Sequence, residues 1–472
     1  MPEKELVVLN PATEEVLAKI EYALRNAIAD SFEAAYEAFL KWSELPLKDR
    51  LHAVRRAAEL LEKRAEEVLR TLVAESGKPI RDAEVEMLRT LSIFRASVEE
   101  ARHVLEGHAP RVDGYEYPLG NENRIVVERR EPIGVIAAAQ SYNNPASTFA
   151  HKVAPNIVAG NTVVLKPSSY TPLTAMKMAE ILHEAGVPKG VVQVLVARGE
   201  EFFDEALANE RVAGVAFTGS TQVALQVWSK AAAYGKKFMG APGGSDPFIV
   251  FDDADLERAA ATGVRARFEN AGQNCNAAKR FFVHRKLFDQ FVKTFVDRAA
   301  SLKVDDPMDP STDMGPVISD KMVTQMAKFV KDAVDKGGEL LYGGRRLERK
   351  GFFFAPTVIK FDQFVDAAVM KDEVFGPIAP IVPFETEEEV VKYANSTIYG
   401  LQAAVFTADY RRAFRVAKAI RAGAVMINDT TRVRFDALPY GGVKMSGFGW
   451  REGVRSTMYF FTEPKYYVLN IS

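Results

Sequence analysis

The chain of 472 residues has a single cysteine, no large excess of charge of either sign and no long apolar run. One cysteine cannot form an intrachain disulfide or a cysteine-rich metal site, and we predict no bound metal. Because the sequence has neither a signal pattern nor a membrane span, we expect the protein in a reducing compartment, the cytoplasm. A formal net charge of -2 gives no field that attracts nucleic acid or anionic membranes, so the expected partner is a small molecule. Residues 1–5 show no signal pattern, and no apolar run approaches the roughly 20 residues of a membrane span.

The single cysteine, Cys275, follows a run of small and polar residues, Ala271-Gly272-Gln273-Asn274. A lone cysteine is either an inert core residue or a nucleophile. Such neighbours are more typical of a turn that presents a thiol than of a packed core. The residues alone leave both interpretations open, and any thiol chemistry must take place at this position.

The hydropathy pattern predicts helices first and two α/β regions after them. Apolar residues at three and four spacing predict helices over 23–42, 47–75 and 80–105. Short apolar runs then alternate with helical stretches, first at 134–139, 162–165, 191–196 and 212–217, and again at 248–251, 281–283, 379–383 and 424–427. This alternation indicates an α/β fold with a doubly wound parallel sheet followed by a second α/β domain.

Two extended segments lie outside this alternation. The pattern within 115–131 matches a hairpin, and the tail at 459–471 matches an extended segment that can pair with it. Projecting ribbons leave open strand edges, and a homodimer or homotetramer would cover them. The predicted boundaries are 1–114 with 134–245 for the first domain, 246–452 for the second, and 115–133 with 453–472 for the ribbon.

Two strand ends in the first region carry side chains suited to a phosphate-rich ligand. Lys166, Ser168 and Ser169 follow one apolar strand, and Gly219 and Ser220 follow a later one, just before a helix. Ligands of doubly wound sheets lie at the carboxyl ends of strands, and a helix start with free amides binds pyrophosphate. Hydroxyl side chains that cap a tight turn would explain either segment alone. Together they favour a dinucleotide site, although no GxGxxG motif follows the first strand.

Six motifs follow one another along the chain: Ser141-Tyr142-Asn143-Asn144-Pro145, Gly160-Asn161-Thr162-Val163-Val164-Leu165-Lys166-Pro167-Ser168, Phe217-Thr218-Gly219-Ser220, Gly272-Gln273-Asn274-Cys275, Glu373-Val374-Phe375-Gly376-Pro377 and Pro439-Tyr440-Gly441-Gly442-Val443-Lys444-Met445-Ser446-Gly447. In this order they resemble the aldehyde dehydrogenase superfamily, most closely its lactaldehyde, glyceraldehyde and semialdehyde dehydrogenase branch. The resemblance covers nearly the whole chain. It implies a Rossmann-like cofactor domain, a catalytic α/β domain, an oligomerisation ribbon and oxidation of a small-molecule aldehyde by NAD or NADP.

The resemblance also implies catalytic roles. It places Cys275 at the nucleophile's position, where the sulfur attacks the aldehyde to give a thiohemiacetal. It places Asn143 at the oxyanion position, where its amide acts with the backbone N–H of Cys275. Hydride transfer to the nicotinamide then leaves a thioester on the sulfur.

For the cofactor, the resemblance implies a second set of residues. Lys166 would bind the adenine-side ribose or its phosphate, with Ser168 and Ser169 beside it. Gly219 and Ser220 would bind the pyrophosphate. Glu373 would bind the nicotinamide ribose, and Phe375 would pack near the nicotinamide. Ser169 departs from the glutamate that strongly NAD-preferring relatives have there. A hydroxyl neither repels a 2′-phosphate nor requires a free 2′-hydroxyl, so we expect NADP, with dual use of NAD as the alternative. Ala224 stands where many relatives have glycine, with no predicted consequence.

The most important departure from the family pattern affects hydrolysis of the thioester. Ala241-Pro242-Gly243-Gly244 stands where the family normally has Glu-Leu-Gly-Gly, whose glutamate activates the hydrolytic water. A methyl group cannot accept a proton, and losing a general base costs about a hundred- to ten-thousandfold in rate. Three explanations stay open: the glutamate was replaced in this particular chain, another carboxylate such as Glu373 or Glu269 is the base, or the acyl group leaves to a thiol such as coenzyme A. In each case we predict acylation of Cys275, with slow deacylation.

The expected aldehyde tunnel is flanked by polar residues. Asn144, His151 and Glu269 are placed there by the motifs, and Arg434 lies in a segment, 428–436, that resembles lactaldehyde, glyceraldehyde and phosphonoacetaldehyde relatives. A polar lining favours a small hydroxylated aldehyde. Succinic semialdehyde relatives have arginines at the positions of His151 and Glu269, whereas Glu269 would repel a substrate carboxylate. Succinic semialdehyde is therefore the less favoured substrate. The simpler alternatives are that His151 caps a helix, Glu269 is solvated and Arg434 pairs with Asp436.

The sequence therefore predicts an NAD(P)-dependent dehydrogenase of a small hydroxyaldehyde such as lactaldehyde or glyceraldehyde. One rival is an acylating or succinic-semialdehyde-type dehydrogenase. The other is a catalytically silent binding or structural protein on the same fold. Intact Cys275, Asn143 and cofactor residues argue against the silent protein, because a structural role has no need of them.

Overall fold

A computed structural model describes residues 4–472; residues 1–3, which open the predicted cofactor domain, lie outside the described residues. A hairpin that the hydropathy pattern did not predict comes first, with β1 (Glu5–Leu9) antiparallel to β2 (Val16–Glu21). Four helices follow: α1 (Arg25–Trp42), α2 (Leu47–Lys63), α3 (Ala65–Ser76) and α4 (Ile80–Leu105). The helix expected over 47–75 is broken at Arg64, whose φ of -104° and ψ of 18° leave the helical region. The Arg64 side chain binds Glu67 on α3 and Glu184 on α6 (Pro172–Glu184).

The first large sheet has five parallel strands in the order β6-β5-β4-β7-β8. They are β4 (Val135–Ala139), β5 (Thr162–Lys166), β6 (Val192–Val194), β7 (Val212–Thr218) and β8 (Lys237–Ala241). The connecting helices are α5 (Pro145–Ala159), α6, α7 (Gly199–Ala208) and α8 (Thr221–Ala233). The doubly wound sheet predicted from the first series of apolar runs is confirmed.

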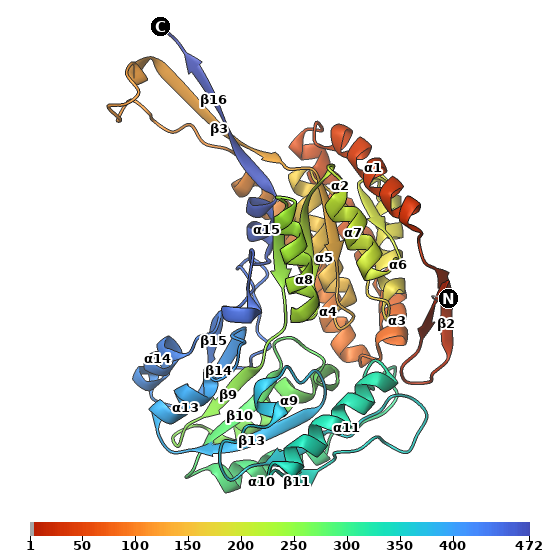
Figure 1. The fold of residues 1–472 in the computed structure, drawn as a ribbon, viewed down its shortest axis with the longest axis vertical. Coiled ribbons are helices and arrows are strands. Elements are labelled where there is room, and N and C mark those ends of the chain that lie inside the picture. The colour runs from red at the N-terminus through yellow and green to blue at the C-terminus, as the bar shows by residue number, and fades with distance from the viewer. Residues whose placement is uncertain (1–3) are drawn as a thin grey trace.

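Alternation of side chains along the strands gives this sheet two apolar faces, and each face is covered by helices (Figure 1). Val135, Ala137 and Val215 pack with α1, α7 and α8, whereas Ile136 and Ala138 pack with α2 to α6. The predicted amino-terminal helices are therefore covering helices. Covering on both faces is what a buried parallel sheet requires.

The second large sheet has seven strands in the order β11-β12-β13-β10-β9-β14-β15, and only β11 runs antiparallel to its neighbour. They are β9 (Asp246–Val250), β10 (Ala278–His284), β11 (Glu339–Tyr342), β12 (Thr357–Lys360), β13 (Ile378–Phe384), β14 (Gln402–Phe406) and β15 (Ala424–Ile427). The helices around it are α9 (Leu256–Phe268), α10 (Phe288–Ala300), α11 (Asp320–Asp335), α12 (Ala368–Lys371), α13 (Glu387–Ala394) and α14 (Tyr410–Ala419). This confirms the second α/β region.

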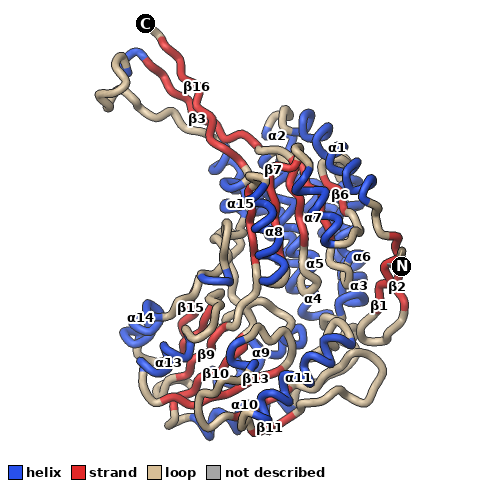
Figure 2. The backbone as a smooth tube through the Cα atoms, viewed as in Figure 1, coloured by secondary structure: helices blue, strands red, loops and turns tan. Residues whose placement is uncertain are grey.

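A two-stranded ribbon projects from the body and carries the carboxyl terminus at its tip (Figures 1 and 2). β3 (Arg124–Pro132) pairs antiparallel with β16 (Thr462–Asn470), which follows α15 (Val454–Phe460). The pairing of the two segments is as expected, but the hairpin predicted within 115–131 is wrong. Residues 115–120 form turns and bends and residues 121–123 a short 3-10 helix. Pro118 lacks the N–H that a strand needs, and Gly120 takes a left-handed φ of 79°.

No helix among residues 4–472 is both long and apolar enough to cross a membrane. The same residues contain no group of three or more His, Cys, Asp or Glu side chains placed to hold a metal ion.

Candidate active site

A pocket of about 1960 Å³ lies between the two large sheets. Its walls come from the carboxyl ends of β4, β5, β7 and β8 on one side and from the loop before β10 on the other. The residues assigned to the site from the sequence all line it, namely Asn143, Asn144, His151, Lys166, Ser168, Ser169, Gly219, Ser220, Ala241, Glu269, Cys275, Glu373, Phe375 and Arg434. The fold therefore brings the predicted residues into one cavity.

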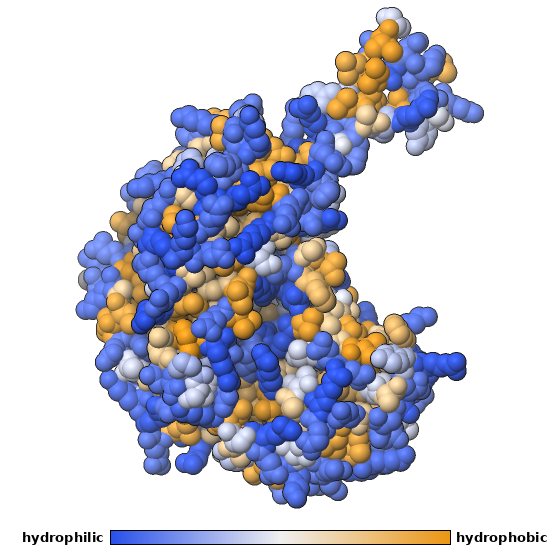
Figure 3. Space-filling view, turned by 180° about the vertical axis from the view of Figure 1, so that it is seen from behind, coloured by the Kyte–Doolittle hydropathy of each residue, from blue (hydrophilic) through white to orange (hydrophobic). Residues whose placement is uncertain are grey.

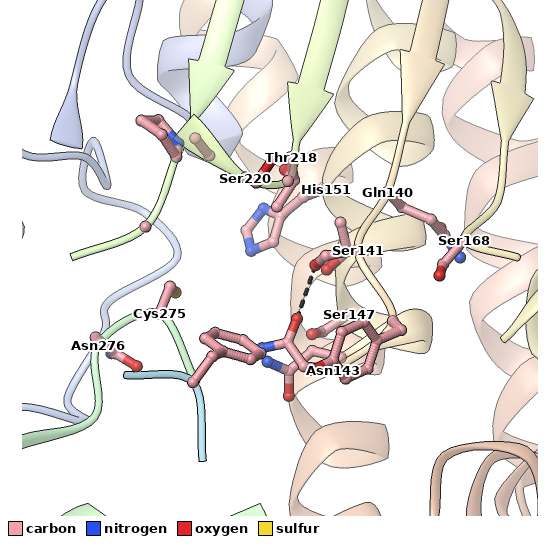
Figure 4. A pocket seen from close by; sticks show the side chains of 18 of the residues that line it. Gln140, Ser141, Asn143, Ser147, His151, Ser168, Thr218, Ser220, Cys275 and Asn276 are labelled. Carbon is pink, nitrogen blue, oxygen red and sulfur yellow. Dashed lines mark hydrogen bonds between the residues drawn. The ribbon is translucent and has the colours of Figure 1, made fainter. Parts of the chain in front are cut away.

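Cys275 lies at the end of a strained turn. Asn270 and Ala271 both have a φ of 53° and Gly272 one of 71°, so three successive residues are left-handed. Left-handed backbone in non-glycine residues is costly and persists only where the surroundings impose it. The Lys279 ammonium, fully buried, donates to the carbonyl oxygen of Cys275 at 2.5 Å and holds the end of the turn. The turn predicted around the thiol is confirmed, and the sulfur faces the pocket instead of the core (Figure 4).

The nearest polar partner of the thiol is Tyr440. Its hydroxyl oxygen lies 3.1 Å from Sγ of Cys275. Sequence reasoning missed this contact, although Tyr440 stands within one of the six motifs, because the two residues are 165 positions apart. Glu452, described below, was missed for the same reason, since it lies 300 positions from its partner Lys152.

Asn143 lies across the pocket from the thiol (Figure 4). Its Oδ1 accepts a hydrogen bond from Ser141 Oγ at 2.7 Å. Its carbonyl oxygen accepts one from Nδ2 of Asn270 at 3.2 Å, which ties it to the turn before Cys275. With Oδ1 engaged by Ser141, the Nδ2 of Asn143 is the donor left for an oxygen bound in the pocket.

A glutamate from α4 fixes the helix that follows this asparagine. Oε1 of Glu86 accepts the backbone N–H groups of Ala146 at 2.8 Å and Ser147 at 3.1 Å, which are orphan donors at the start of α5. Lys78 forms a buried ion pair with Glu86 and donates to Oδ1 of Asn144 at 2.8 Å. The predicted substrate residue Asn144 is thus already bound by a lysine.

Ala241 ends β8 opposite Thr218 of β7, and its methyl group lines the pocket. A carboxylate reaches the loop after β8 from the segment between α12 and β13: Oε1 of Glu373 accepts the N–H of Gly244 at 3.2 Å and lies 3.7 Å from the Lys279 ammonium. Burial raises the pKa of Glu373 above its ordinary value, and Lys279 only partly opposes this. Glu373 is therefore a better proton acceptor than an exposed glutamate.

Glu269, the other candidate carboxylate, is held by an arginine. Its Oε1 accepts from Nη2 of Arg432 at 2.6 Å and from Nε at 3.2 Å. Burial would raise the pKa of Glu269, but the Arg432 guanidinium outweighs it and the pKa lies below its ordinary value. Glu269 is paired and not solvated, and it is the weaker base of the two.

His151 lies in the middle of α5, so it does not cap a helix. Its Nε2 is 3.0 Å from Oδ1 of Asp436 and 3.1 Å from Nη2 of Arg89, which itself binds Asp436 at 2.9 Å. Its Nδ1 is buried with no hydrogen-bond partner in the described part of the chain. Burial, assisted by the charge of Arg434, lowers the pKa of His151 to about 4, so the ring is neutral at physiological pH.

Arg434 belongs to a buried cluster beside this histidine. Its Nη2 binds Oε2 of Glu452 at 3.0 Å, and Oε1 of Glu452 binds the fully buried Lys152 at 2.5 Å. Nε of Arg434 also lies 3.4 Å from Asp436, so the pairing considered from the sequence is present but is not the main one. The two cations share the Glu452 carboxylate.

At the other end of the pocket, polar groups lack partners. Oγ1 of Thr218 and both amide atoms of Gln140 are buried without hydrogen bonds in the described chain. Ser220 gives α8 no side-chain cap, so the first N–H groups of this helix stay available. Burial lowers the pKa of Lys166 to about 8, and its only acceptor among residues 4–472 is the carbonyl of Pro167 at 2.9 Å. This donor set fits the phosphates and hydroxyls of a nicotinamide dinucleotide.

Comparison with known proteins gives the class. Residues 1–467 match the model of the "Aldehyde dehydrogenase family". The chain is therefore an oxidoreductase that acts on aldehydes with NAD or NADP as acceptor. It belongs to the aldehyde dehydrogenase family.

Individual relatives cover nearly the whole chain. Mitochondrial succinate-semialdehyde dehydrogenase of Arabidopsis thaliana is 37% identical over 466 residues, which are 99% of this chain and 86% of that protein. Lactaldehyde dehydrogenase of Methanocaldococcus jannaschii is 36% identical over 459 residues, 96% of this chain and 95% of that protein. The crystal structure of glyceraldehyde-3-phosphate dehydrogenase GapN from the same archaeon, complexed with NADP, is 34% identical with a TM-score of 0.92 and covers 100% of both chains.

Proposed function

We propose that this enzyme oxidises a small, uncharged, hydroxylated aldehyde such as lactaldehyde or glyceraldehyde to the acid, with NADP preferred. The observation that carries the proposal is His151, which lines the pocket and whose buried Nδ1 has no hydrogen-bond partner among residues 4–472. An unpartnered buried polar atom is costly, and a ligand hydroxyl removes that cost whichever tautomer the ring adopts. A fatty or aromatic aldehyde would leave the atom unpaired.

The charges around His151 favour an uncharged substrate. Arg89 binds Asp436, Arg432 binds Glu269, and both Arg434 and Lys152 bind Glu452. A substrate carboxylate would have to displace one of these internal carboxylates, and each of them is already matched to its cation. Hydroxyl groups need no such exchange.

Cys275 is the proposed nucleophile. Its sulfur forms a bond to the aldehyde carbon, and the carbonyl electron pair moves to the oxygen, which Nδ2 of Asn143 and the backbone N–H of Cys275 hold. A bound nicotinamide supplies the hydride acceptor that turns the adduct on the sulfur into a thioester. The other cofactor contacts are those proposed above for Lys166, Ser168, Ser169, Gly219, Ser220, Glu373 and Phe375.

Hydrolysis of the thioester is proposed to be slow. Ala241 offers no proton acceptor, and Glu269 is neutralised by Arg432. Glu373 is the carboxylate in this pocket whose pKa is raised, so residual hydrolysis is assigned to it. A thiol acceptor would bypass the need for a base, which keeps acyl transfer as the alternative route.

The NADP preference rests on Ser169 and on the pocket around Lys166. Both residues line the cofactor end, and a serine there carries no charge that would repel a 2′-phosphate. GapN, whose fold is nearly the same, has NADP in its crystal structure. Dual use of NAD is the alternative.

Succinic semialdehyde is the second candidate substrate, because an exposed cation lies near Glu269 in the pocket. Arg265, on α9, lines the pocket from the solvent side. It would be the group that binds a terminal carboxylate. An Arg265→Gln variant that loses kcat/KM for succinic semialdehyde, but not for glyceraldehyde, would favour this candidate.

The ribbon supports a homo-oligomer. Hydrophobic side chains gather along it in Figure 3, and they include Tyr466, Val468, Leu469 and Ile471, which are 50 to 61% exposed. A projecting apolar strand pair needs a cover, and a second copy of the chain is the simplest one. Light scattering would distinguish the proposed homodimer or homotetramer from a monomer. The cytoplasmic location stays a prediction.

A stopped-flow experiment tests the proposal. The enzyme is mixed with excess NADP and D,L-glyceraldehyde, and absorbance of the reduced cofactor is followed. A burst near one equivalent per subunit, followed by slow turnover, is the expected result. Fast linear turnover would contradict slow deacylation. A larger burst rate with succinic semialdehyde than with glyceraldehyde or lactaldehyde would contradict the substrate class.

A further inference from the structure

The reactive sulfur has a hydroxyl neighbour that none of the assigned roles uses. Oη of Tyr440 lies 3.1 Å from Sγ of Cys275, and the tyrosine is 9% exposed. The hydroxyl lines the same pocket as the thiol. Since the two residues come from separate loops, the contact depends on how the second α/β domain is assembled.

Several contacts fix the position of Tyr440. Its backbone N–H donates to the carbonyl of Glu452 at 2.5 Å, and the N–H of Glu452 donates back at 3.1 Å. The Glu452 side chain binds Arg434, and the Arg434 guanidinium stacks over the Tyr440 ring at 4.0 Å from its centroid. One glutamate thus positions both the backbone of the tyrosine and the cation on its ring. A hydroxyl held this way cannot easily turn away from the sulfur.

The direction of the hydrogen bond follows from the protonation of the tyrosine. Burial, reinforced by the nearby Cys275, raises the pKa of Tyr440 well above its ordinary value, although the Arg434 cation opposes this. The hydroxyl therefore keeps its proton at physiological pH. A thiolate has no proton to give, so in the reactive state the hydroxyl donates and the sulfur accepts.

We propose that Tyr440 is a catalytic residue, whose hydroxyl donates a hydrogen bond to the Cys275 thiolate and so favours the reactive form of the sulfur. The inference rests on the proposed role of Cys275 as the nucleophile. A charge-assisted hydrogen bond of this kind is stronger than a neutral one. With alanine at position 241, no carboxylate on that loop assists the thiol, which leaves the tyrosine as its nearest polar side chain.

Other charged groups also face this pair and must be held constant. Arg434 and Arg432 approach from the loop after β15, Asp246 from β9 and Lys279 from β10. A change of the Tyr440 hydroxyl alone leaves all four side chains in place. Tyr440→Phe is therefore the variant of choice.

The test measures alkylation of Cys275, the only thiol of the chain, by iodoacetamide across neutral to alkaline pH, without cofactor or aldehyde. In Tyr440→Phe the rate at neutral pH should fall about tenfold, the size of one lost hydrogen bond to a charged group. The two rates should converge at alkaline pH, where the thiol ionises without help. Tyr393→Phe, which removes a hydroxyl bound to Glu389 on α13, should match the wild type.

Two results would overturn the proposal: an unchanged pH profile in Tyr440→Phe, or a rate lowered equally at every pH, which would mean that the hydroxyl only packs. If Tyr440→Phe does not fold, 3-fluorotyrosine at position 440 provides the test, because its more acidic hydroxyl should raise the alkylation rate at neutral pH. If Cys275 alkylates as proposed while the enzyme gives no burst with any aldehyde, that combination would refute the proposed function and leave the role of Tyr440 intact.

Discussion

At the cofactor end of the pocket, Lys166 has a single carbonyl acceptor among residues 4–472 and the hydroxyl of Thr218 has no partner there. At the substrate end, by contrast, Arg434 and Lys152 already share a carboxylate within the chain. Donors without partners favour a ligand that brings its own negative charge, whereas matched charges favour a ligand that brings none. This difference between the two ends supports the proposed combination of a phosphate-rich cofactor and a neutral substrate.

The largest expected effect is on steady-state turnover, and it comes from Ala241→Glu, between the cofactor end and the substrate end of the pocket. A general base there should raise steady-state turnover about a hundred- to ten-thousandfold and leave the burst unchanged. Steady-state and stopped-flow absorbance of the reduced cofactor measure both. Ala241→Gln, which has the same shape without the base, is the control. Equal turnover of wild type and Ala241→Glu would show that another base already does this work.

Breaking the charge matching at the substrate end should destabilise the fold. Glu452→Gln leaves Lys152 and Arg434 without their shared partner in a buried site, at a cost of about 3–5 kcal/mol. Chemical denaturation measures the free energy of unfolding. Glu66→Gln, which removes the exposed pair with Arg70, is the control and should have no measurable effect. A Glu452→Gln protein as stable as the control would mean that the cluster is solvated.

The neutral His151 predicts an acid-sensitive stability. Its pKa is about 4 in the folded state, whereas an unfolded histidine titrates near about 6.5. Between these values the unfolded chain binds a proton that the native state does not, so stability is lost as pH falls from about 6.5 to 4, by about 3 kcal/mol. Denaturation at a series of pH values should show this slope in the wild type and a flatter one in His151→Gln. Identical slopes would refute the neutral ring.

At the cofactor end, we expect the affinity for NADPH to depend on pH in the alkaline range. The pKa of Lys166 is about 8, so its positive charge is present below that pH and is lost as pH rises through it. Affinity for NADPH, followed by fluorescence, should fall about tenfold as that charge disappears. Lys166→Arg keeps the charge and should remove the pH dependence. A wild-type affinity that does not change in this range would place Lys166 away from the phosphates.

Local patterns locate the strand-end residues of the pocket more readily than the buried charge cluster. Lys166, Ser168 and Ser220 follow apolar strands, so their position in the sheet can be read from neighbours in the sequence. The cluster of Arg89, Lys152 and Glu452 joins three distant segments, and its pairings depend on packing between domains. No periodicity encodes such contacts.

The same difference explains what was missed in the fold. β14 (Gln402–Phe406) was not among the predicted strands, although it is fully buried between β9 and β15. The predicted hairpin at 115–131 failed because strand pairing there is with the distant tail. In both cases the strand is paired with segments that are distant in the sequence, and local patterns do not report such pairing.

The Glu86 carboxylate on α4 has a further consequence for recombining this enzyme with its relatives. It holds the N–H groups of Ala146 and Ser147 at the start of α5, and its ion-pair partner Lys78 holds Asn144. A chimera whose crossover falls between 86 and 143 would inherit the cap from one parent and the capped loop from the other. In a chimera, segments 78–86 and 143–147 should therefore come from the same parent enzyme.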